Sequence, residues 1–132
     1  MPPTKQVIVL QKSLNMRRGK MVAQGAHASL AVFSQHMRVD EDEEGALVAS
    51  FPLTAEAVAW FNTGFKKICV SVDSEAELLS LFERAKAAGL PCALIRDNGL
   101  TEFAGVPTYT AVAIGPAPES SIDPLTRHLP LL

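Results

Sequence analysis

Runs of apolar, largely β-branched residues alternate along the chain with segments in which apolar residues recur at helical spacing. Continuous apolar runs of this kind are typical of strands that are covered on both faces of a sheet. The predicted strands are residues 5–11, 65–72, 91–97 and 108–114, and the segment Gly115-Pro116-Ala117-Pro118 is expected to end the last of them.

Capping residues delimit the helices between these strands. Thr54 can cap a helix that Gly64 stops. Ser74 and Glu77 form a capping box, and Gly89 ends the helix that this box opens. The predicted helices are residues 19 to about 37, 55–62, 75–88 and a short closing segment from Ser121 to about Leu129.

The order of these elements predicts an α/β fold. Helical crossovers join the first three strands, so these strands should run parallel, with right-handed connections. The fourth strand follows its neighbour through the open loop 98–107 and can run antiparallel. Covering both faces then requires a three-layer α/β/α sandwich with a four-stranded mixed sheet. The chain shows no internal repeat or linker, so residues 1–132 are expected to form a single domain.

Cations gather where a helix normally disfavours them. Arg17, Arg18 and Lys20 open the long helix, and Lys12 lies just before them. Free backbone N–H groups and the helix dipole give a helix start a partial positive charge, which favours acidic residues there. A bound anion, phosphate above all, is the obvious compensation. The alternative is an ordinary solvated loop, which costs little free energy.

The same helix carries a polar stripe. Lys20, Gln24 and His27 are spaced i, i+4 and i+7, so they share one face. Gly25 and Ala28 belong to the neighbouring stripe, where small side chains permit close packing on a sheet. The polar stripe therefore begins at the basic cluster and continues with an amide and an imidazole.

Further polar residues follow the third strand. Ligands on open α/β sheets bind beyond the carboxyl ends of the strands, where Asp97 and Thr101 are expected to meet the basic helix start. Thr108 and Thr110 alternate on the fourth strand and therefore face the same side. Taken alone, Asp97 is equally consistent with a turn cap, and the two threonines with ordinary strand positions.

Composition narrows the classes of function. The 132 residues are 48% hydrophobic and 20% charged, with a net charge of −2, so bulk charge does not drive this globular chain onto nucleic acid. Cys69 and Cys92 fall in predicted core strands and are expected to be buried free thiols, and no residues show the spacing of metal ligands. No apolar run approaches the roughly 20 residues of a membrane helix. The acidic run 40–44 is expected to be a solvated loop.

Four segments occur in a characteristic order. They are KQVIVLQ, GKMVAQGAHA at the helix start, LIRDNGLTE after the third strand, and YTAVAIGPAP near the end of the chain. In this combination they resemble the class 2 (archaeal/eukaryotic-type) peptidyl-tRNA hydrolases. The resemblance covers most of the chain, although the stretch from about His36 to Phe65 is longer and more acidic than the family usually shows.

The resemblance implies a fold, an activity and partners. It implies a mixed four-stranded sheet, often in a homodimer, and cleavage of the ester that joins a peptide or N-blocked amino acid to the 3′ end of tRNA. It implies no metal or organic cofactor, no membrane partner and a cytoplasmic location. By motif match, the catalytic group is Lys20, Asp97 and Thr101.

Substrate-binding positions follow from the same match and from the basic cluster. Gln24, His27, Thr108 and Thr110 are expected to line the site, and Lys12, Arg17 and Arg18 to contact phosphates of tRNA. Asp97 can orient or deprotonate a water, and the Lys20 ammonium can stabilise an oxyanion. No Ser-His-Asp spacing indicates a covalent nucleophile, so direct attack by water is the expected chemistry.

Three positions depart from the family pattern. The loop before the helix reads Ser13-Leu14-Asn15-Met16 where the family commonly has D-L-K-M, and Arg18 stands where a lysine is common. Arginine keeps the charge but cannot release a proton as lysine can. A second class of function therefore stays open, in which a non-catalytic or re-purposed relative binds a nucleotide, RNA or protein partner at the same edge.

Overall fold

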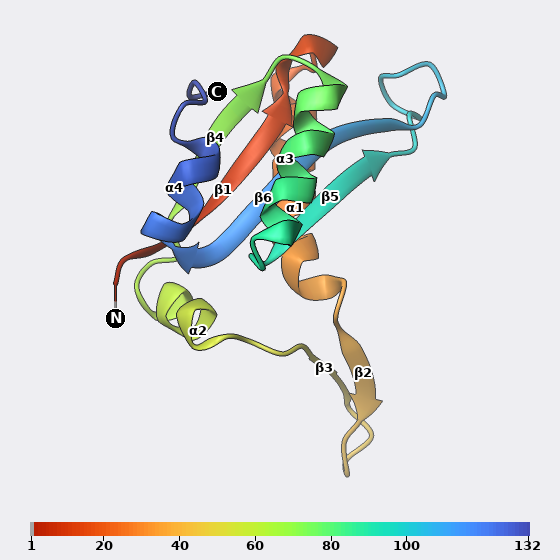
Figure 1. The fold of residues 1–132 in the computed structure, drawn as a ribbon. Helices are drawn as coiled ribbons and strands as arrows, with labels where there is room; N and C mark the ends of the chain where they lie inside the picture. Colours follow the sequence, from red (N-terminus) through yellow and green to blue (C-terminus); the bar gives the residue numbers. More distant parts are fainter. Residues whose placement is uncertain (1) are drawn as a thin grey trace.

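A four-stranded mixed sheet forms the centre of the fold (Figure 1). The structure is a computed structural model and describes residues 2–132. The strands lie in the order β4-β1-β6-β5, with bounds β1 (Thr4–Gln11), β4 (Lys67–Val72), β5 (Cys92–Asp97) and β6 (Thr108–Pro118). β1 pairs in parallel with β4 and antiparallel with β6, which also pairs antiparallel with β5. The prediction of three parallel strands and one antiparallel strand is confirmed.

Helices cover both faces of this sheet, so the predicted three-layer sandwich is confirmed. The helices are α1 (Arg18–Ser34), α2 (Ala55–Asn62), α3 (Glu75–Ala87) and α4 (Glu119–Thr126). Figure 1 shows α3 and α4 on one face of the sheet and α1 on the other. The buried residues form two clusters accordingly, one beneath α3 and α4 and the other beneath α1 and α2.

The alternation of side chains along β1 explains the two clusters. Val7 and Val9 lie in the cluster beneath α3 and α4, whereas Ile8 and Leu10 lie in the cluster beneath α1 and α2. Successive side chains of a strand point to opposite faces, and each of these four is at most 5% exposed. A stretch of strand that is buried on both faces is expected to be apolar, which is the pattern of residues 7–10.

Small residues bring α1 close to the sheet. A Cβ atom at Gly25 would lie 3.5 Å from Cγ2 of Ile8, and Ala28 is fully buried. This close approach places the first turns of α1 beside the carboxyl ends of β1 and β5. Figure 1 shows the arrowheads of both strands at the same edge of the sheet.

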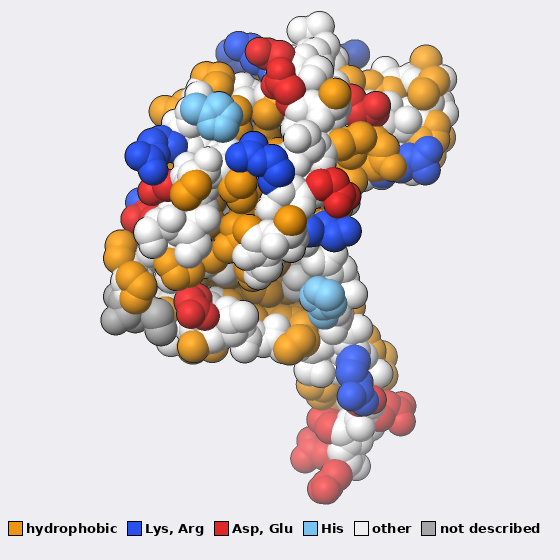
Figure 2. Space-filling view, viewed as in Figure 1, with side chains coloured by type: hydrophobic (Ala, Val, Ile, Leu, Met, Phe, Trp, Pro, Cys, Tyr) orange, Lys and Arg blue, Asp and Glu red, His pale blue; other side chains and the backbone are white. Residues whose placement is uncertain are grey.

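The acidic run 40–44 is part of a β-hairpin, so its prediction as a loop is right for residues 42–44 and wrong for Asp40 and Glu41, which end a strand. β2 (Arg38–Glu41) pairs antiparallel with β3 (Leu47–Ser50), and every residue of both strands is exposed. In the turn, Oδ1 of Asp42 accepts hydrogen bonds from the backbone N–H groups of Glu44 and Ala46, each at 2.9 Å. Figure 2 shows acidic side chains gathered at the tip of this projecting hairpin. The expectation that the run is solvated is confirmed.

Several predicted boundaries also need correction. α1 ends at Ser34, three residues before Met37, and β4 begins at Lys67. β6 continues through Gly115 to Pro118, where the segment expected to end it still pairs with β1. The chain therefore enters α4 at Glu119, ahead of the expected cap at Ser121.

The two cysteines are less buried than the apolar pattern predicts. Cys69 is exposed and Cys92 is half-buried, both as free thiols. Cys69 lies on the edge strand β4, whose face toward α1 is left open, so the expectation of two buried thiols is wrong. Helices in the described part of the chain are not long and apolar enough to cross a membrane.

The cap of α3 gives a first test of how the sequence defines its helices. Oγ of Ser74 accepts a hydrogen bond from the backbone N–H of Glu77 at 3.1 Å. We expect Ser74→Ala to lower the free energy of unfolding by about 1 kcal/mol, because this N–H loses its acceptor. The thermal midpoint should fall by roughly 4 °C in a calorimetric scan. Ser80→Ala, in the interior of the same helix, is the control and should leave the midpoint unchanged or slightly raised.

Candidate functional site

A polar cleft lies where β1 and β5 end and α1 begins. Its volume is about 490 Å³. The residues that line it are Arg17, Lys20, Ala23, Gln24, His27, Asp97, Asn98, Thr101 and Glu102. The polar stripe of α1 thus faces the loop that follows β5, as the helical spacing predicts.

Lys20 is at the centre of the cleft. Its Nζ donates hydrogen bonds to Oδ1 of Asp97 at 2.9 Å and to Oγ1 of Thr101 at 2.6 Å. The side chains of Lys20 and Asp97 are 11% and 12% exposed, so little water screens the pair. The Phe103 ring lies 5.7 Å from the ammonium and adds an apolar wall with a cation–π contact. The prediction that Lys20, Asp97 and Thr101 meet at one sheet edge is confirmed.

Both oxygens of the Asp97 carboxylate accept hydrogen bonds. Oδ1 accepts from Lys20 and, at 3.3 Å, from Nε2 of Gln24, and Oδ2 accepts from the backbone N–H of Gly99 at 2.9 Å. The Lys20 hydrogen bond is the largest cause that holds the pKa of Asp97 below its usual range, and partial burial opposes it. Asp97 is therefore ionised at neutral pH and is a weak proton acceptor.

The second residue of the loop after β5 has a backbone conformation and surroundings that only glycine fits. Gly99 has a φ of +82°, and a Cβ atom there would lie 2.3 Å from the carbonyl oxygen of Val106. The N–H of Gly105 donates to the carbonyl of Gly99 at 2.9 Å, which closes the loop. This folded loop holds Thr101 against Lys20.

The other predicted site residues lie at different depths. Gln24 lines the floor of the cleft and is 1% exposed, whereas Thr110 lies outside the lining and is 0% exposed. Oγ1 of Thr110 donates to Oε1 of Gln24 at 2.5 Å. His27 is exposed on the cleft wall. Thr108 is half-buried, outside the cleft lining, and its hydroxyl donates to the carbonyl of Val106 at 2.8 Å.

The basic residues are divided between two sides of α1. Arg17 lies on the rim of the cleft, with its Nε 3.6 Å from Oε1 of Glu102. Arg18 instead lines a second cavity on the other side of the helix. Lys12 is exposed in the 3-10 turn Lys12–Leu14 that follows β1. The structure therefore brings Arg17 to the cleft and leaves Arg18 and Lys12 outside its lining.

Sequence reasoning did not find every residue of the cleft. Phe103 contacts Lys20 but was not singled out, because an aromatic residue in a loop has no periodic pattern. Asn98 and Glu102 belong to the LIRDNGLTE segment, and that segment is the signal that points to them.

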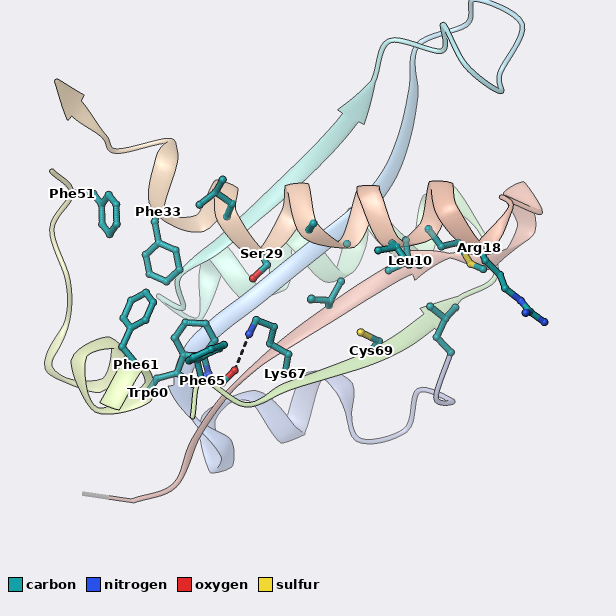
Figure 3. Close-up of a pocket in the computed structure, with 17 residues that line it drawn as sticks. Leu10, Arg18, Ser29, Phe33, Phe51, Trp60, Phe61, Phe65, Lys67 and Cys69 are labelled. Atoms are coloured by element: carbon teal, nitrogen blue, oxygen red, sulfur yellow. Dashed lines mark hydrogen bonds between the residues drawn. The ribbon is translucent and has the colours of Figure 1, made fainter. Parts of the chain in front are cut away.

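The second cavity is larger and almost entirely apolar. This groove has a volume of about 910 Å³ and lies between α1, α2, β1 and β4 (Figure 3). At one end, Figure 3 shows Phe33, Phe51, Trp60, Phe61 and Phe65 clustered together. The chemistry of its lining suits packing against an apolar surface, whereas the smaller cleft brings an ammonium, a carboxylate and a hydroxyl together.

Lys67 enters this groove among the aromatic rings. Its Nζ donates to the carbonyl of Phe65 at 2.9 Å and lies 4.1 Å and 5.1 Å from the ring centroids of Phe65 and Trp60. Desolvation lowers the pKa of Lys67, and the neighbouring Cys69 partly opposes that shift. The contacts describe a lysine whose stem packs on apolar surface while its ammonium interacts with ring faces.

Comparison with known proteins shows the family. A family model described as peptidyl-tRNA hydrolase PTH2 matches residues 4–132. A peptidyl-tRNA hydrolase of Methanocaldococcus jannaschii is 41% identical over 128 residues, which cover 97% of this chain and 99% of the relative. Relatives of the same name from Thermococcus onnurineus and Methanopyrus kandleri are 40% and 43% identical, each with 97% of both chains covered. This chain, with its Lys20–Asp97–Thr101 cleft, belongs to the peptidyl-tRNA hydrolase PTH2 family.

Proposed function

We propose that this chain, as a single domain of residues 1–132, hydrolyses the ester between a peptide or N-blocked amino acid and tRNA in peptidyl-tRNA. Family membership supports the substrate. The observation that carries the chemistry is the contact of one ammonium with a carboxylate and a hydroxyl in a polar cleft. No observation favours the alternative of a re-purposed, non-catalytic relative.

The reaction needs an activated water and stabilisation of negative charge. Water attacks the ester carbonyl, a tetrahedral oxyanion forms, and the ester C–O bond then breaks to release the terminal ribose oxygen, which takes up a proton. The Lys20 ammonium lies in a cleft with little water and can stabilise the oxyanion. The Thr101 hydroxyl, which accepts from Lys20, can donate its own proton in a hydrogen bond to the ester oxygen or accept one from the attacking water.

Asp97 is the residue that orients the attacking water. Among the described residues, its Oδ2 has one hydrogen-bond donor, the Gly99 N–H, so a further lone pair can accept from water. Because the Lys20 hydrogen bond keeps the pKa of Asp97 low, the carboxylate takes the water proton late, as the new C–O bond forms. Its main contribution is then the direction of attack.

The cleft favours direct attack by water over a covalent intermediate. Within the described part of the chain, its lining contains neither serine nor cysteine. The Thr101 hydroxyl accepts a hydrogen bond from an ammonium, which withdraws electron density from the oxygen and opposes its use as a nucleophile. The protein is thus assigned a direct transfer of the acyl group to water, through the tetrahedral oxyanion and without an acyl-enzyme.

The basic residues around the cleft are assigned to the tRNA backbone. Arg17 on the rim is nearest to the reacting groups, while Arg18 and Lys12 extend the positive charge on either side. Exposed His27 is assigned to the acceptor end of the substrate, and half-buried Thr108 to support of the loop through Val106. A protein that acts on peptidyl-tRNA is expected in the cytoplasm, where translation takes place.

A homodimer is proposed on the family resemblance, and the apolar groove supplies a surface for it. Val22 and Leu30 project from α1 into the groove and are 72% and 63% exposed, and Phe61 and Phe65 are also exposed. Contiguous apolar surface of this kind marks interfaces in soluble proteins. In a dimer with two-fold symmetry, this self-complementary face would meet the same face of a second copy.

Asp97→Asn tests the catalytic assignment. We expect hydrolysis of an N-acetyl-aminoacyl-tRNA to fall by roughly 10²–10⁴-fold while tRNA binding persists, because size is kept and the carboxylate is lost. Asp123→Asn is the matched control, since Asp123 forms a similar pair with Lys5 at 2.6 Å away from the cleft. It should affect the thermal midpoint and leave ester cleavage intact. Near-normal cleavage by Asp97→Asn would make Asp97 a turn residue.

Replacement of Arg17 and Arg18 together by alanine tests the phosphate contacts. The logarithm of tRNA affinity should fall linearly with the logarithm of salt concentration, with a slope that counts phosphate contacts. We expect the double variant to bind tRNA more weakly at low salt. The slope should become flatter by an amount that corresponds to the loss of about one to two phosphate contacts. Measurement by filter binding over a salt series decides this, and an unchanged slope would mean that both arginines are merely solvated.

Val22→Asp tests the dimer surface. A carboxylate in the apolar groove would be desolvated without a partner in the dimer, so we expect a shift from dimer to monomer in light scattering. Val58→Asp on α2 is the control, because Val58 is also an exposed valine on a helix but lies outside the groove lining. A wild-type chain that is monomeric at micromolar concentration, or equal dissociation by both variants, would exclude the groove as the interface.

A further inference from the structure

Two polar side chains lie beneath the cleft without access to solvent. Gln24 on α1 is 1% exposed and Thr110 on β6 is 0% exposed. The motif match places both among residues that line the site, yet Thr110 lies outside the cleft lining, and the amide of Gln24 is hydrogen-bonded to Thr110 and Asp97. Burial of an amide or a hydroxyl costs free energy unless the group is hydrogen-bonded. The hydrogen-bond partners of Gln24 and Thr110 therefore indicate the role of each side chain.

The partners form a chain of contacts that ends on the catalytic carboxylate. Oγ1 of Thr110 donates to Oε1 of Gln24 at 2.5 Å, and Nε2 of Gln24 donates to Oδ1 of Asp97 at 3.3 Å. Thr110 comes from β6, Gln24 from α1 and Asp97 from the end of β5. The chain therefore joins three elements that are far apart in the sequence.

The two ends of a glutamine amide have the same shape but opposite polarity. With Nε2 toward the carboxylate, the carbonyl oxygen points into the protein, where it needs a donor. The Thr110 hydroxyl supplies that donor. In the reverse orientation, the amide oxygen would face the negative charge of Asp97 and repel it. The charge of Asp97 therefore selects this amide orientation, and the Thr110 hydroxyl satisfies the buried carbonyl oxygen that the orientation leaves.

We propose that Thr110 and Gln24 are positioning residues, which fix the direction of the Asp97 carboxylate and do not bind substrate. Lys20 and Gln24 together hold Oδ1, and Gly99 holds Oδ2 from one side. With these contacts in place, the remaining lone pair of Oδ2 is directed at the water position. Without the amide, the carboxylate can rotate about its Cβ–Cγ bond around the Lys20 contact. This proposal rests on the role of Asp97 given above.

The alternative role, direct contact with substrate, predicts a different kinetic signature. A residue that binds the ground state and transition state equally changes KM when it is removed, whereas one that acts only through the reacting group changes kcat. A purely structural role predicts a lower thermal midpoint with unchanged specific activity of the folded protein.

Thr110→Val is the central variant, because valine keeps the shape and removes the hydroxyl. We expect kcat for N-acetyl-aminoacyl-tRNA to fall by roughly 10–100-fold with KM unchanged, the scale of a small misplacement of a reacting group. Thr110→Ser restores the donor and should recover most of the activity. Thr126→Val is the matched control, since Thr126 is also buried but donates within α4, to the carbonyl of Ile122.

A titration of Asp97 supplies a readout that needs no activity. The hydrogen bond and charge of Lys20 and the Gly99 N–H lower the pKa of Asp97, and the Gln24 hydrogen bond adds the smallest contribution in the same direction. Carbon-13 NMR of the Asp97 carboxyl should therefore show a higher pKa in Thr110→Val than in wild type, with no change in Thr126→Val. The titration also distinguishes failure of the proposed function from failure of the positioning role. Absence of ester cleavage by the wild type would contradict the proposed function, whereas an unchanged pKa of Asp97 in Thr110→Val would contradict the positioning role.

Gln24→Met completes a double-mutant cycle. Methionine keeps the length and removes both the donor and the acceptor, so the contact chain is already broken when Thr110 is then changed. If the two residues act as one unit, the double variant should be no slower than Gln24→Met alone. Additive losses, a rise in KM at constant kcat, or wild-type kinetics in Thr110→Val would each overturn the proposal.

Discussion

The Lys20–Asp97 pair is the interaction on which the rest of the site depends. An ammonium and a carboxylate 2.9 Å apart, each little exposed, are stable only if their remaining hydrogen-bonding capacity is used. Here Thr101, Gln24 and the Gly99 N–H complete it. Because the pKa of Asp97 is lowered, the pair contributes stability above the usual carboxyl range and loses it as the pH falls through the lowered value.

Each partner of that pair is supplied by a different feature of the fold. The parallel direction of β1 and β5 brings the start of α1 and the end of β5 to one edge. Gly25 permits α1 to approach Ile8, which lowers Gln24 to the depth of Asp97. Gly99 permits the turn that directs its N–H to the carboxylate and places Thr101 over Lys20. The site is therefore a consequence of backbone geometry as much as of the polar residues.

The sequence predicts most of this arrangement, and the exceptions have identifiable causes. Three features follow from the sequence through crossover connections, caps and the rule for strand ends. They are the strand directions, the helix spanning Ala55–Asn62 and the meeting of Lys20 with Asp97. The hairpin Arg38–Ser50 escapes prediction because its strands are exposed on both faces and carry no alternating pattern. Cys69 escapes because an apolar run does not reveal which part of a sheet face a helix leaves open.

The two sides of α1 line two different cavities. Lys20, Gln24 and His27 follow one side, while Val22 and Leu30 follow the other and line the apolar groove. Arg18 falls on the groove side and Arg17 on the cleft side, although they are adjacent in sequence. A second copy on the groove would therefore leave the cleft open to tRNA and place its Arg18 near the interface. The two arginines of the basic cluster, which look equivalent in the sequence, thus face different cavities.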